Sequence, residues 1–134
     1  MTPPNAPRIL VVEDHPLIAD LVETRLRIEG MAPTVCLGGR EALARLASER
    51  FDVAILDVMM PDVDGHEVLR HIRRTAATAT LPVIFLTARS TPADVEAGLA
   101  LGADHYLTKP FSGQELVRRV RDCLTRGTAA VAAG

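Results

Sequence analysis

Five short apolar segments alternate with five longer segments in which apolar residues recur at helical spacing. Short apolar runs bounded by turn residues are typical of buried strands, and apolar residues three and four positions apart are typical of amphipathic helices. The alternation implies a parallel sheet with right-handed crossovers and with helices on both faces. The expected strands are residues 9–12, 32–37, 51–57, 81–87 and 104–107. The expected helices are 15–29, 40–50, 66–74 after a turn and helix cap at 62–65, 91–100 and 116–124.

The polarity of these strands predicts their order in the sheet. The runs that lead into Glu13, Asp57 and Thr87 are the most apolar and belong in its centre, whereas residues 32–37 and 104–107 are polar enough for its edges. We therefore expect an α/β fold whose doubly wound, five-stranded parallel sheet has the order 2-1-3-4-5, a flavodoxin-like (βα)5 arrangement. Ligands of such sheets bind at the carboxyl ends of the strands, beside the switch point between the first and third strands.

Length and composition indicate one ordinary globular domain. The 134 residues are 24% charged and 48% hydrophobic with a net charge of −2, which gives no reason to expect direct contact with nucleic acid. Cys36 and Cys123 lie far apart, so reduced structural thiols are expected. No segment resembles a membrane span or an export signal, so we expect a cytoplasmic protein. The expected organisation is an extension at 1–7, a domain at 8–125 and a tail or linker at 126–134.

Three acidic residues follow the two strands expected at the centre of the sheet. Glu13 and Asp14 come after the first strand, and Asp57 ends the third. Several carboxylates at one point repel one another unless some are protonated or a cation binds. Because all these ligands are oxygens, a hard cation is favoured, and Mg²⁺ fits best with a backbone carbonyl from Met59 as a further ligand.

The other two strand ends carry groups that a phosphoryl group would need. Lys109 can neutralise a phosphoryl oxygen with its charge, and Thr87 can donate a hydroxyl hydrogen bond. Taken separately, Thr87 would be an ordinary strand residue and Lys109 an ordinary surface lysine. Their occurrence at the same edge as the acids, one group at each strand end, favours a site for phosphoryl chemistry.

These motifs resemble those of the response regulator receiver domains of two-component signal transduction, including the chemotaxis regulators, over about residues 7–125. The loop Met60-Pro61-Asp62-Val63-Asp64-Gly65 also resembles the loop that follows the family's phosphoacceptor. The resemblance implies a role for each matching residue: Glu13 and Asp14 as the metal-binding pair, Asp57 as phosphoacceptor, Thr87 as switch hydroxyl, Tyr106 as switch aromatic, and Lys109 as the phosphate-binding lysine before a cis bond to Pro110.

The function implied by the resemblance is that of a signalling domain rather than an enzyme. Asp57 would accept a phosphoryl group from a phosphohistidine on a sensor histidine kinase or a phosphotransfer protein, with Mg²⁺ bound. The surface made by the helix from Pro92, the strand at Tyr106 and the final helix would then change for a downstream effector protein or domain. The helix from Pro92 has a thin apolar face, as expected of a movable element. Catalysis would extend only to the domain's own phosphorylation and slow dephosphorylation.

The sequence departs from the family at several places. Val95 and His105 replace residues with which winged-helix members of the family pair across a dimer, so we expect a monomer or a weak dimer. Met59 and Arg89 are bulky and lie two positions after Asp57 and Thr87, so we hypothesise that they hinder hydrolysis of the phosphorylated form. The arginines of the last helix face solvent or serve an acidic partner: Arg118, Arg119 and Arg121.

Three alternatives remain open on the sequence. A flavin-binding protein of this fold would need a Gly/Ser/Thr-rich loop after the first strand, where Glu13-Asp14-His15-Pro16 would repel a phosphate. A phosphatase with an Asp-x-Asp nucleophile would need an acid in place of Met59. A receiver-like scaffold that binds partners without phosphorylation is disfavoured only because no expected site residue is missing.

Overall fold

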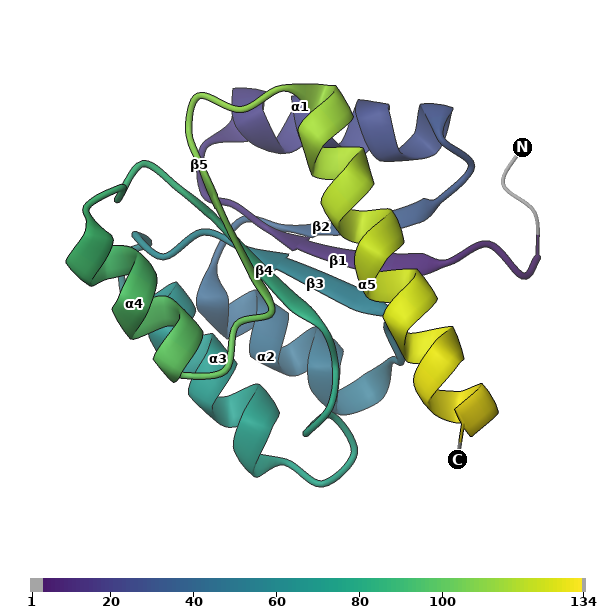
Figure 1. Cartoon of the computed structure of the whole chain (residues 1–134). Helices are drawn as coiled ribbons and strands as arrows, with labels where there is room; N and C mark the ends of the chain where they lie inside the picture. The colour runs from purple at the N-terminus through teal and green to yellow at the C-terminus, as the bar shows by residue number, and fades with distance from the viewer. Residues whose placement is uncertain (1–3, 134) are drawn as a thin grey trace.

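A computed structural model describes the backbone of residues 4–133 and the side chains of residues 4–125. Five parallel strands form one sheet in the order β2-β1-β3-β4-β5, which confirms the predicted fold class (Figure 1). The strands are β1 (Arg8–Val12), β2 (Ala32–Cys36), β3 (Val53–Leu56), β4 (Val83–Thr87) and β5 (His105–Thr108). The helices are α1 (Pro16–Ile28), α2 (Gly39–Ser48), α3 (Gly65–Arg74), α4 (Pro92–Ala100) and α5 (Gly113–Ala133).

The sheet lies between two layers of helices. Helices α1 and α5 cover one face, while α2, α3 and α4 cover the other (Figure 1). Successive residues of a strand point to opposite faces, so each strand contributes to two cores. Within β1, Ile9 packs with Val22 of α1 and Leu116 of α5, whereas Leu10 packs with the cluster that includes Ile72 of α3. Every residue of β3 and β4 is buried, as expected of central strands.

Helix α4 is the most weakly anchored of the shorter helices. Its only buried residue is Gly98, and its Leu99 is 45% exposed. Thr91 caps its beginning by accepting a hydrogen bond from the backbone N–H of Asp94, at 3.1 Å. The thin apolar face expected from the sequence is therefore present in the structure.

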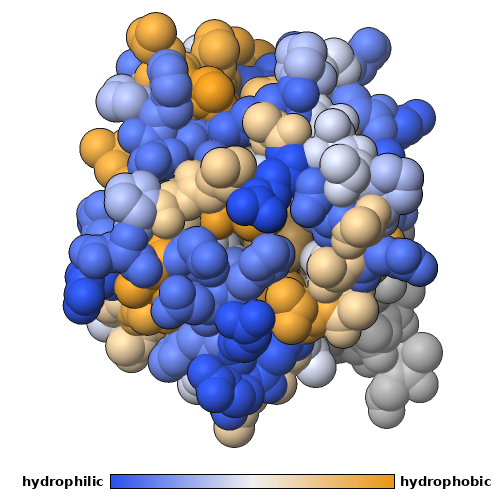
Figure 2. Space-filling view, turned by 90° about the vertical axis from the view of Figure 1, so that its left-hand side faces the viewer, coloured by the Kyte–Doolittle hydropathy of each residue, from blue (hydrophilic) through white to orange (hydrophobic). Residues whose placement is uncertain are grey.

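Helix α1 carries a second apolar stripe that faces away from the sheet. Ala19, Val22 and Leu26 form its buried side. Leu17 and Leu21 are 69% and 66% exposed, and both line a groove toward the loop that follows β5. Figure 2 shows hydrophobic side chains gathered at the top of the molecule, the level at which α1 lies in Figure 1.

The ends of the chain bear on the expected organisation. Helix α5 continues to Ala133, so residues 126–133 of the tail expected at 126–134 continue the backbone of the last helix. Residues 1–3 of the expected extension at 1–7, and residue 134, lie outside the described residues. None of the helices in the described part of the chain has the length and apolar character to cross a membrane.

Candidate functional site

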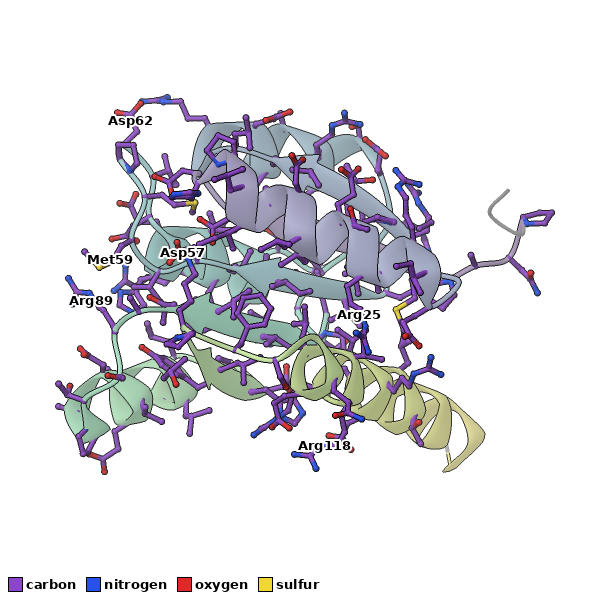
Figure 3. All side chains as sticks on the ribbon, turned by 90° about the horizontal axis from the view of Figure 1, so that it is seen from above. Arg25, Asp57, Met59, Asp62, Arg89 and Arg118 are labelled. Atoms are coloured by element: carbon purple, nitrogen blue, oxygen red, sulfur yellow. The ribbon has the colours of Figure 1, made fainter. Side chains whose placement is uncertain are left out.

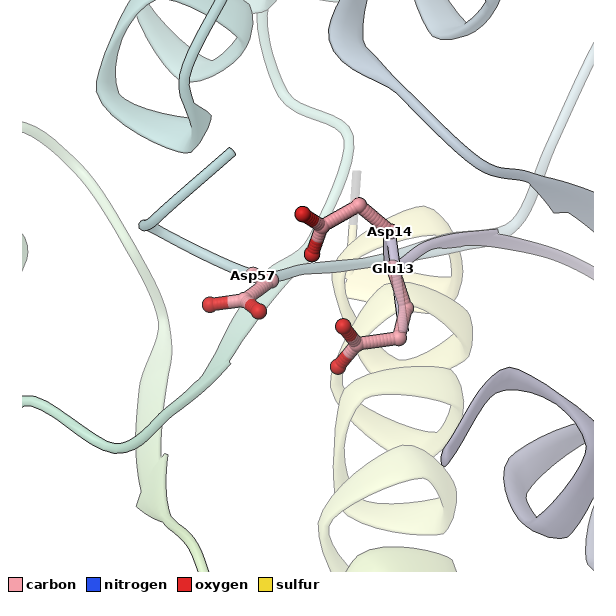
Figure 4. A group of neighbouring side chains, drawn as sticks. All are labelled: Glu13, Asp14 and Asp57. Carbon is pink, nitrogen blue, oxygen red and sulfur yellow. The ribbon is translucent and has the colours of Figure 1, made fainter. Parts of the chain in front are cut away.

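The carboxyl ends of the central strands bring three acidic side chains together. Val12 and Leu56 are partners in the parallel pairing of β1 with β3, so the residues that follow them start from adjacent strands. The backbone N–H of Asp57 donates to the carbonyl oxygen of Val12 at 2.9 Å, which extends this pairing by one residue. Carboxylate oxygens of Glu13, Asp14 and Asp57 lie within 4.8 Å of one another (Figure 4).

Lys109 lies between two of these acids. Its Nζ donates to Oε1 of Glu13 at 2.5 Å and to Oδ2 of Asp57 at 3.0 Å. In sequence, Lys109 is 96 residues from Glu13 and 52 residues from Asp57. Its backbone N–H donates to the carbonyl oxygen of Thr87 at 2.8 Å, which ties it to the end of β4. The Lys109–Pro110 peptide bond is cis, the geometry that the resemblance implied.

Burial and mutual repulsion set the electrostatics of the group. Burial raises the pKa of Glu13 above its ordinary value, and the charge of Asp57 adds to this, against opposing hydrogen bonds from Lys109 and from the backbone N–H of His15. Burial works to lower the pKa of Lys109, but its hydrogen bonds to Glu13 and Asp57 outweigh that effect and raise it. Three carboxylates thus face one ammonium group, and the excess negative charge suits a cation.

The donors of this group fit a hard divalent cation such as Mg²⁺. They are all carboxylate oxygens, and Asp14 is partly exposed, so an ion there could keep several of its waters. Met59 starts the loop beside them, and its backbone N–H donates to Oδ1 of Asp57 at 3.1 Å. The histidines are not part of the set, because within the described residues the carboxylates of Glu13, Asp14 and Asp57 are the one group suited to a metal.

The loop after Asp57 doubles back on itself. The backbone N–H of Gly65, the first residue of α3, donates to the carbonyl oxygen of Val58 at 3.0 Å. A side chain at Gly65 would overlap the carbonyl oxygen of Asp57. The sequence predicts Gly65 only as part of a turn and helix cap. A glycine at the start of a helix is the signal that could have indicated this close backbone approach.

Thr87, Arg89 and Tyr106 are linked beside the acidic group. The fully buried Oγ1 of Thr87 accepts a hydrogen bond from the backbone N–H of Arg89 at 3.3 Å. The hydroxyl of Tyr106 donates to the carbonyl oxygen of Arg89 at 2.8 Å. The Tyr106 ring packs edge-on against Phe85, with 5.9 Å between ring centroids, and a side chain at Gly98 would collide with it. Burial, with a contribution from the charge of Asp94, raises the pKa of Tyr106.

Met59 and Arg89 lie at the rim of the site, both on the same side of Asp57 in Figure 3. The side chain of Met59 is 53% exposed, and both residues line one shallow pocket together with His66. Arg89 also approaches Asp94, with 3.7 Å between Nη1 and Oδ1. The two bulky side chains therefore lie together beside the loop after Asp57, and their effect on hydrolysis stays a prediction.

The arginines of α5 are engaged within the chain. Arg118 and Arg119 both pair with Glu115, and Arg121 pairs with Glu29, the residue directly after α1. Nδ1 of His105 accepts a hydrogen bond from Arg119 at 3.0 Å, and its Nε2 donates to Asp122 at 2.8 Å. These pairs support the interpretation of the arginines as a surface face of the helix rather than as a dedicated anion site.

Comparison with known proteins agrees with this geometry. The family model described as "Response regulator receiver domain" matches residues 9–121. The transcriptional regulatory protein TrcR of Mycobacterium tuberculosis is 45% identical over 121 residues, which are 90% of this chain and 46% of that protein. The chain spans about half the length of the curated relatives it matches.

Solved structures give the same result. The receiver domain of the Francisella response regulator 1452 superposes with a TM-score of 0.85 at 37% identity, over 90% of this chain and 98% of that one. The chemotaxis protein CheY4 of Vibrio cholerae superposes with a TM-score of 0.84 at 33% identity, over 89% and 99% of the two chains. Both likenesses extend over almost the whole of the solved domain.

Proposed function

Because the chain belongs to the response regulator receiver domain family of two-component systems, we propose that it is a phosphoacceptor whose Asp57 takes a phosphoryl group from a phosphohistidine. The observation that carries the proposal is the position of Lys109, whose Nζ donates to both Glu13 and Asp57 beside a third carboxylate, Asp14. One ammonium group cannot neutralise three carboxylates, so the group keeps an excess of negative charge. The donor would be a sensor histidine kinase or a histidine phosphotransfer protein in the cytoplasm.

The transfer exchanges one bond to phosphorus for another. An oxygen of the Asp57 carboxylate attacks the phosphorus, the bond from phosphorus to the donor's imidazole nitrogen breaks, and an acyl phosphate forms on Asp57. Lys109 stabilises the negative charge on the phosphoryl oxygens, and the buried site strengthens that attraction. Glu13, Asp14, Asp57 and the Met59 carbonyl would hold Mg²⁺, which when bound offsets further charge on the phosphoryl group.

The response would reach the surface through Thr87 and Tyr106. The Thr87 hydroxyl would turn toward a phosphoryl oxygen and release the backbone N–H of Arg89, whose carbonyl holds the Tyr106 hydroxyl. Tyr106 rests on α4, whose one buried residue is Gly98, so its movement is transmitted to a weakly held helix. Inverting a population from 1:99 to 99:1 requires about 5.5 kcal/mol of preference for one state. The α4-β5-α5 surface would then bind a downstream effector.

The chain is expected to act as a monomer or a weak dimer. His105 is engaged with Arg119 and Asp122 of its own chain, and Val95 on α4 has no charge to offer a partner. One position of the surface pairs that winged-helix family members use is therefore engaged within the chain, and the other carries no charge. No feature of the acidic group favours catalysis on another substrate, and the proposed role is that of a signalling domain.

The proposal is tested by exposing the protein to a small phosphodonor with Mg²⁺ and measuring its intact mass. We expect a gain of one phosphoryl group in the parent, loss of this gain in Asp57→Ala, and its retention in Asp52→Ala, which changes an acid just before β3. No gain in the parent would overturn the proposal in favour of a scaffold that binds partners without phosphorylation.

The same samples test the rim residues. After removal of the donor, a Met59→Ala, Arg89→Ala double variant should lose its phosphoryl group faster than the parent, because both side chains are half exposed at the approach to Asp57. A Leu99→Ala variant, which changes an exposed apolar residue of α4, is the control. Equal decay in the double variant and the parent would remove the idea that these side chains exclude water.

A further inference from the structure

We propose that Gly39, at the beginning of α2, is a positioning residue that holds the loop bearing the Met59 carbonyl in the shape that binds Mg²⁺. Gly39 is 18 residues before Asp57 and touches none of the expected metal ligands. The inference rests on the proposed function, because it concerns the metal site of the same phosphoacceptor. The inference adds to the metal site a residue of α2, a helix that carries none of the other expected site residues.

The loop at residues 57–64 is held at both of its ends, where it leaves β3 and where it enters α3. Val58 and Met60 are 3% and 7% exposed, so they anchor the loop in the core while Met59 between them stays at the surface. The N–H of Gly65 is bonded to the carbonyl oxygen of Val58, and the Asp57 carbonyl lies against the same glycine. Residues 57, 58 and 65 therefore cannot move far without breaking α3 away from β3.

The second point of support is Gly39. It is buried at the first position of α2, and a Cβ built on it would overlap the carbonyl oxygen of Val63 and crowd the Val63 side chain, with 2.8 Å to Cβ and to Cγ1. Real Cβ atoms do not approach backbone so closely, so any side chain at position 39 would push the loop outward or shift α2. The absence of a side chain at Gly39 thus sets how close the loop lies to the beginning of α2.

The loop does not keep this shape through its own conformational preference. Asp62 has φ of 70°, in the left-handed region that costs a residue other than glycine some free energy. Its one ion pair, with Arg40 Nε at 3.2 Å, joins side chains that are 69% and 76% exposed and contributes little. Packing of Met60 in the core, and of the loop against Gly39 and Gly65, therefore has to hold residues 59–63 in place.

A displacement of Val63 would be taken up by the loop residues between Val58 and Gly65. Because the loop is fixed at Val58 and Gly65, an outward push at Val63 is taken up by residues 59–62, and it strains the packing of the buried Met60 next to the Met59 carbonyl. Changes in groups that orient a metal ligand commonly reduce metal affinity by about 10- to 100-fold. The acidic side chains stay on β1 and β3 and would still bind the ion, so we expect the lower figure.

Adjacent glycines supply a matched pair for the test. Gly39→Ala should weaken Mg²⁺ binding about tenfold, measured by titration calorimetry of the unphosphorylated protein. Gly38→Ala should leave it unchanged, because Gly38 has extended backbone with φ of −166° and nothing within 4 Å of an added Cβ. With a small phosphodonor, Gly39→Ala should need more Mg²⁺ for half-maximal phosphorylation but reach the parental rate at saturation. A merely structural role would lower the rate at every Mg²⁺ concentration.

The outcomes separate the inference from the proposed function. If Gly39→Ala binds Mg²⁺ as tightly as Gly38→Ala, the inference is wrong, whereas failure of the parent to gain a phosphoryl group overturns the function itself. Should Gly39→Ala not fold, Val63→Gly serves instead, because it removes the Cβ and Cγ1 that pack on Gly39 and frees the loop. Unchanged Mg²⁺ affinity in Val63→Gly would then overturn the inference.

Discussion

The two ends of the sheet each hold a partly buried cation, but with opposite charge balance. At the carboxyl end, Lys109 is 16% exposed and faces a group of three carboxylates. At the amino ends of β4 and β5, Arg73 of α3 is 22% exposed and meets one carboxylate, that of Asp104, at 3.2 Å. One end has a surplus of negative charge, and the other has none.

Arg73 uses its whole guanidinium group to join three segments. Its five N–H donors reach the carbonyl oxygens of Ala79, Leu81 and Gly102 and the carboxylate of Asp104. These acceptors precede β4 and β5, so one side chain fixes the start of both strands against the end of α3. The neutral carbonyls would otherwise be left without partners at the edge of the core.

The difference shows which charges maintain the fold and which are reserved for a ligand. Satisfied donors stabilise a structure, and removal of their cation leaves acceptors unpaired. Clustered acids destabilise a structure until a cation arrives, which is a common cost of a functional site. Substitutions at the two ends should therefore change stability in opposite directions.

The largest effect is expected at the Arg73 end. Arg73→Met keeps much of the apolar stem but removes all five hydrogen bonds, so we expect a loss of about 3 kcal/mol in the free energy of unfolding. Chemical denaturation followed by circular dichroism measures this, since the chain has no tryptophan. The control is Arg70→Met, an exposed arginine of the same helix, which should change stability by less than about 0.5 kcal/mol. A loss below about 1 kcal/mol in the free energy of unfolding of Arg73→Met would contradict the view that this end of the sheet maintains the fold.

A smaller effect of opposite sign is expected at Asp14. Without metal, Asp14→Asn should raise the free energy of unfolding by about 1 kcal/mol at low ionic strength, because it removes one of three neighbouring charges. Mg²⁺ at ten times its dissociation constant should stabilise the parent by about 1.4 kcal/mol, and the variant much less. Asp20→Asn on α1, outside the acidic group, should behave like the parent. Lower metal-free stability in Asp14→Asn would contradict a surplus of charge.

The smallest effect concerns the pH dependence of Glu13. Since the folded protein raises the pKa of Glu13, this group favours folding at low pH, and its contribution is lost as pH rises through the raised value. Glu13→Gln cannot ionise, so its metal-free stability relative to the parent should increase from about pH 4.3, the ordinary glutamate value, toward neutrality. Denaturation of both proteins across this range measures the difference. A difference that shrinks as pH rises would show that Lys109 more than compensates the buried carboxylate.

The carboxyl end of the sheet was predictable from sequence and the amino end was not. Glu13, Asp57 and Thr87 each follow an apolar run, and parallel strands bring such positions to one edge. Arg73 follows the apolar positions of an amphipathic helix, and its partners are mostly backbone carbonyls, which leave no trace in the sequence. A pattern of side chains cannot reveal a site built from main-chain acceptors.

Apolar periodicity also fails to say which of two faces is buried. Leu17 and Leu21 recur at helical spacing with Val22 and Leu26, yet the first two are exposed and the last two are buried. The sheet can cover only one side of α1, and the choice depends on where α5 leaves room. The contact of Gly39 with the loop after Asp57 was missed for a related reason, because it joins segments of two different crossovers.

The packing of Tyr106 has a practical consequence. It is the one tyrosine of a chain without tryptophan, so ultraviolet emission from the native protein originates from that ring. The ring touches Phe85 and the backbone of α4, and its hydroxyl is bonded to Arg89. Its fluorescence lifetime and quenching therefore give a label-free optical signal of what happens at the α4-β5 surface, without a dye that would perturb it.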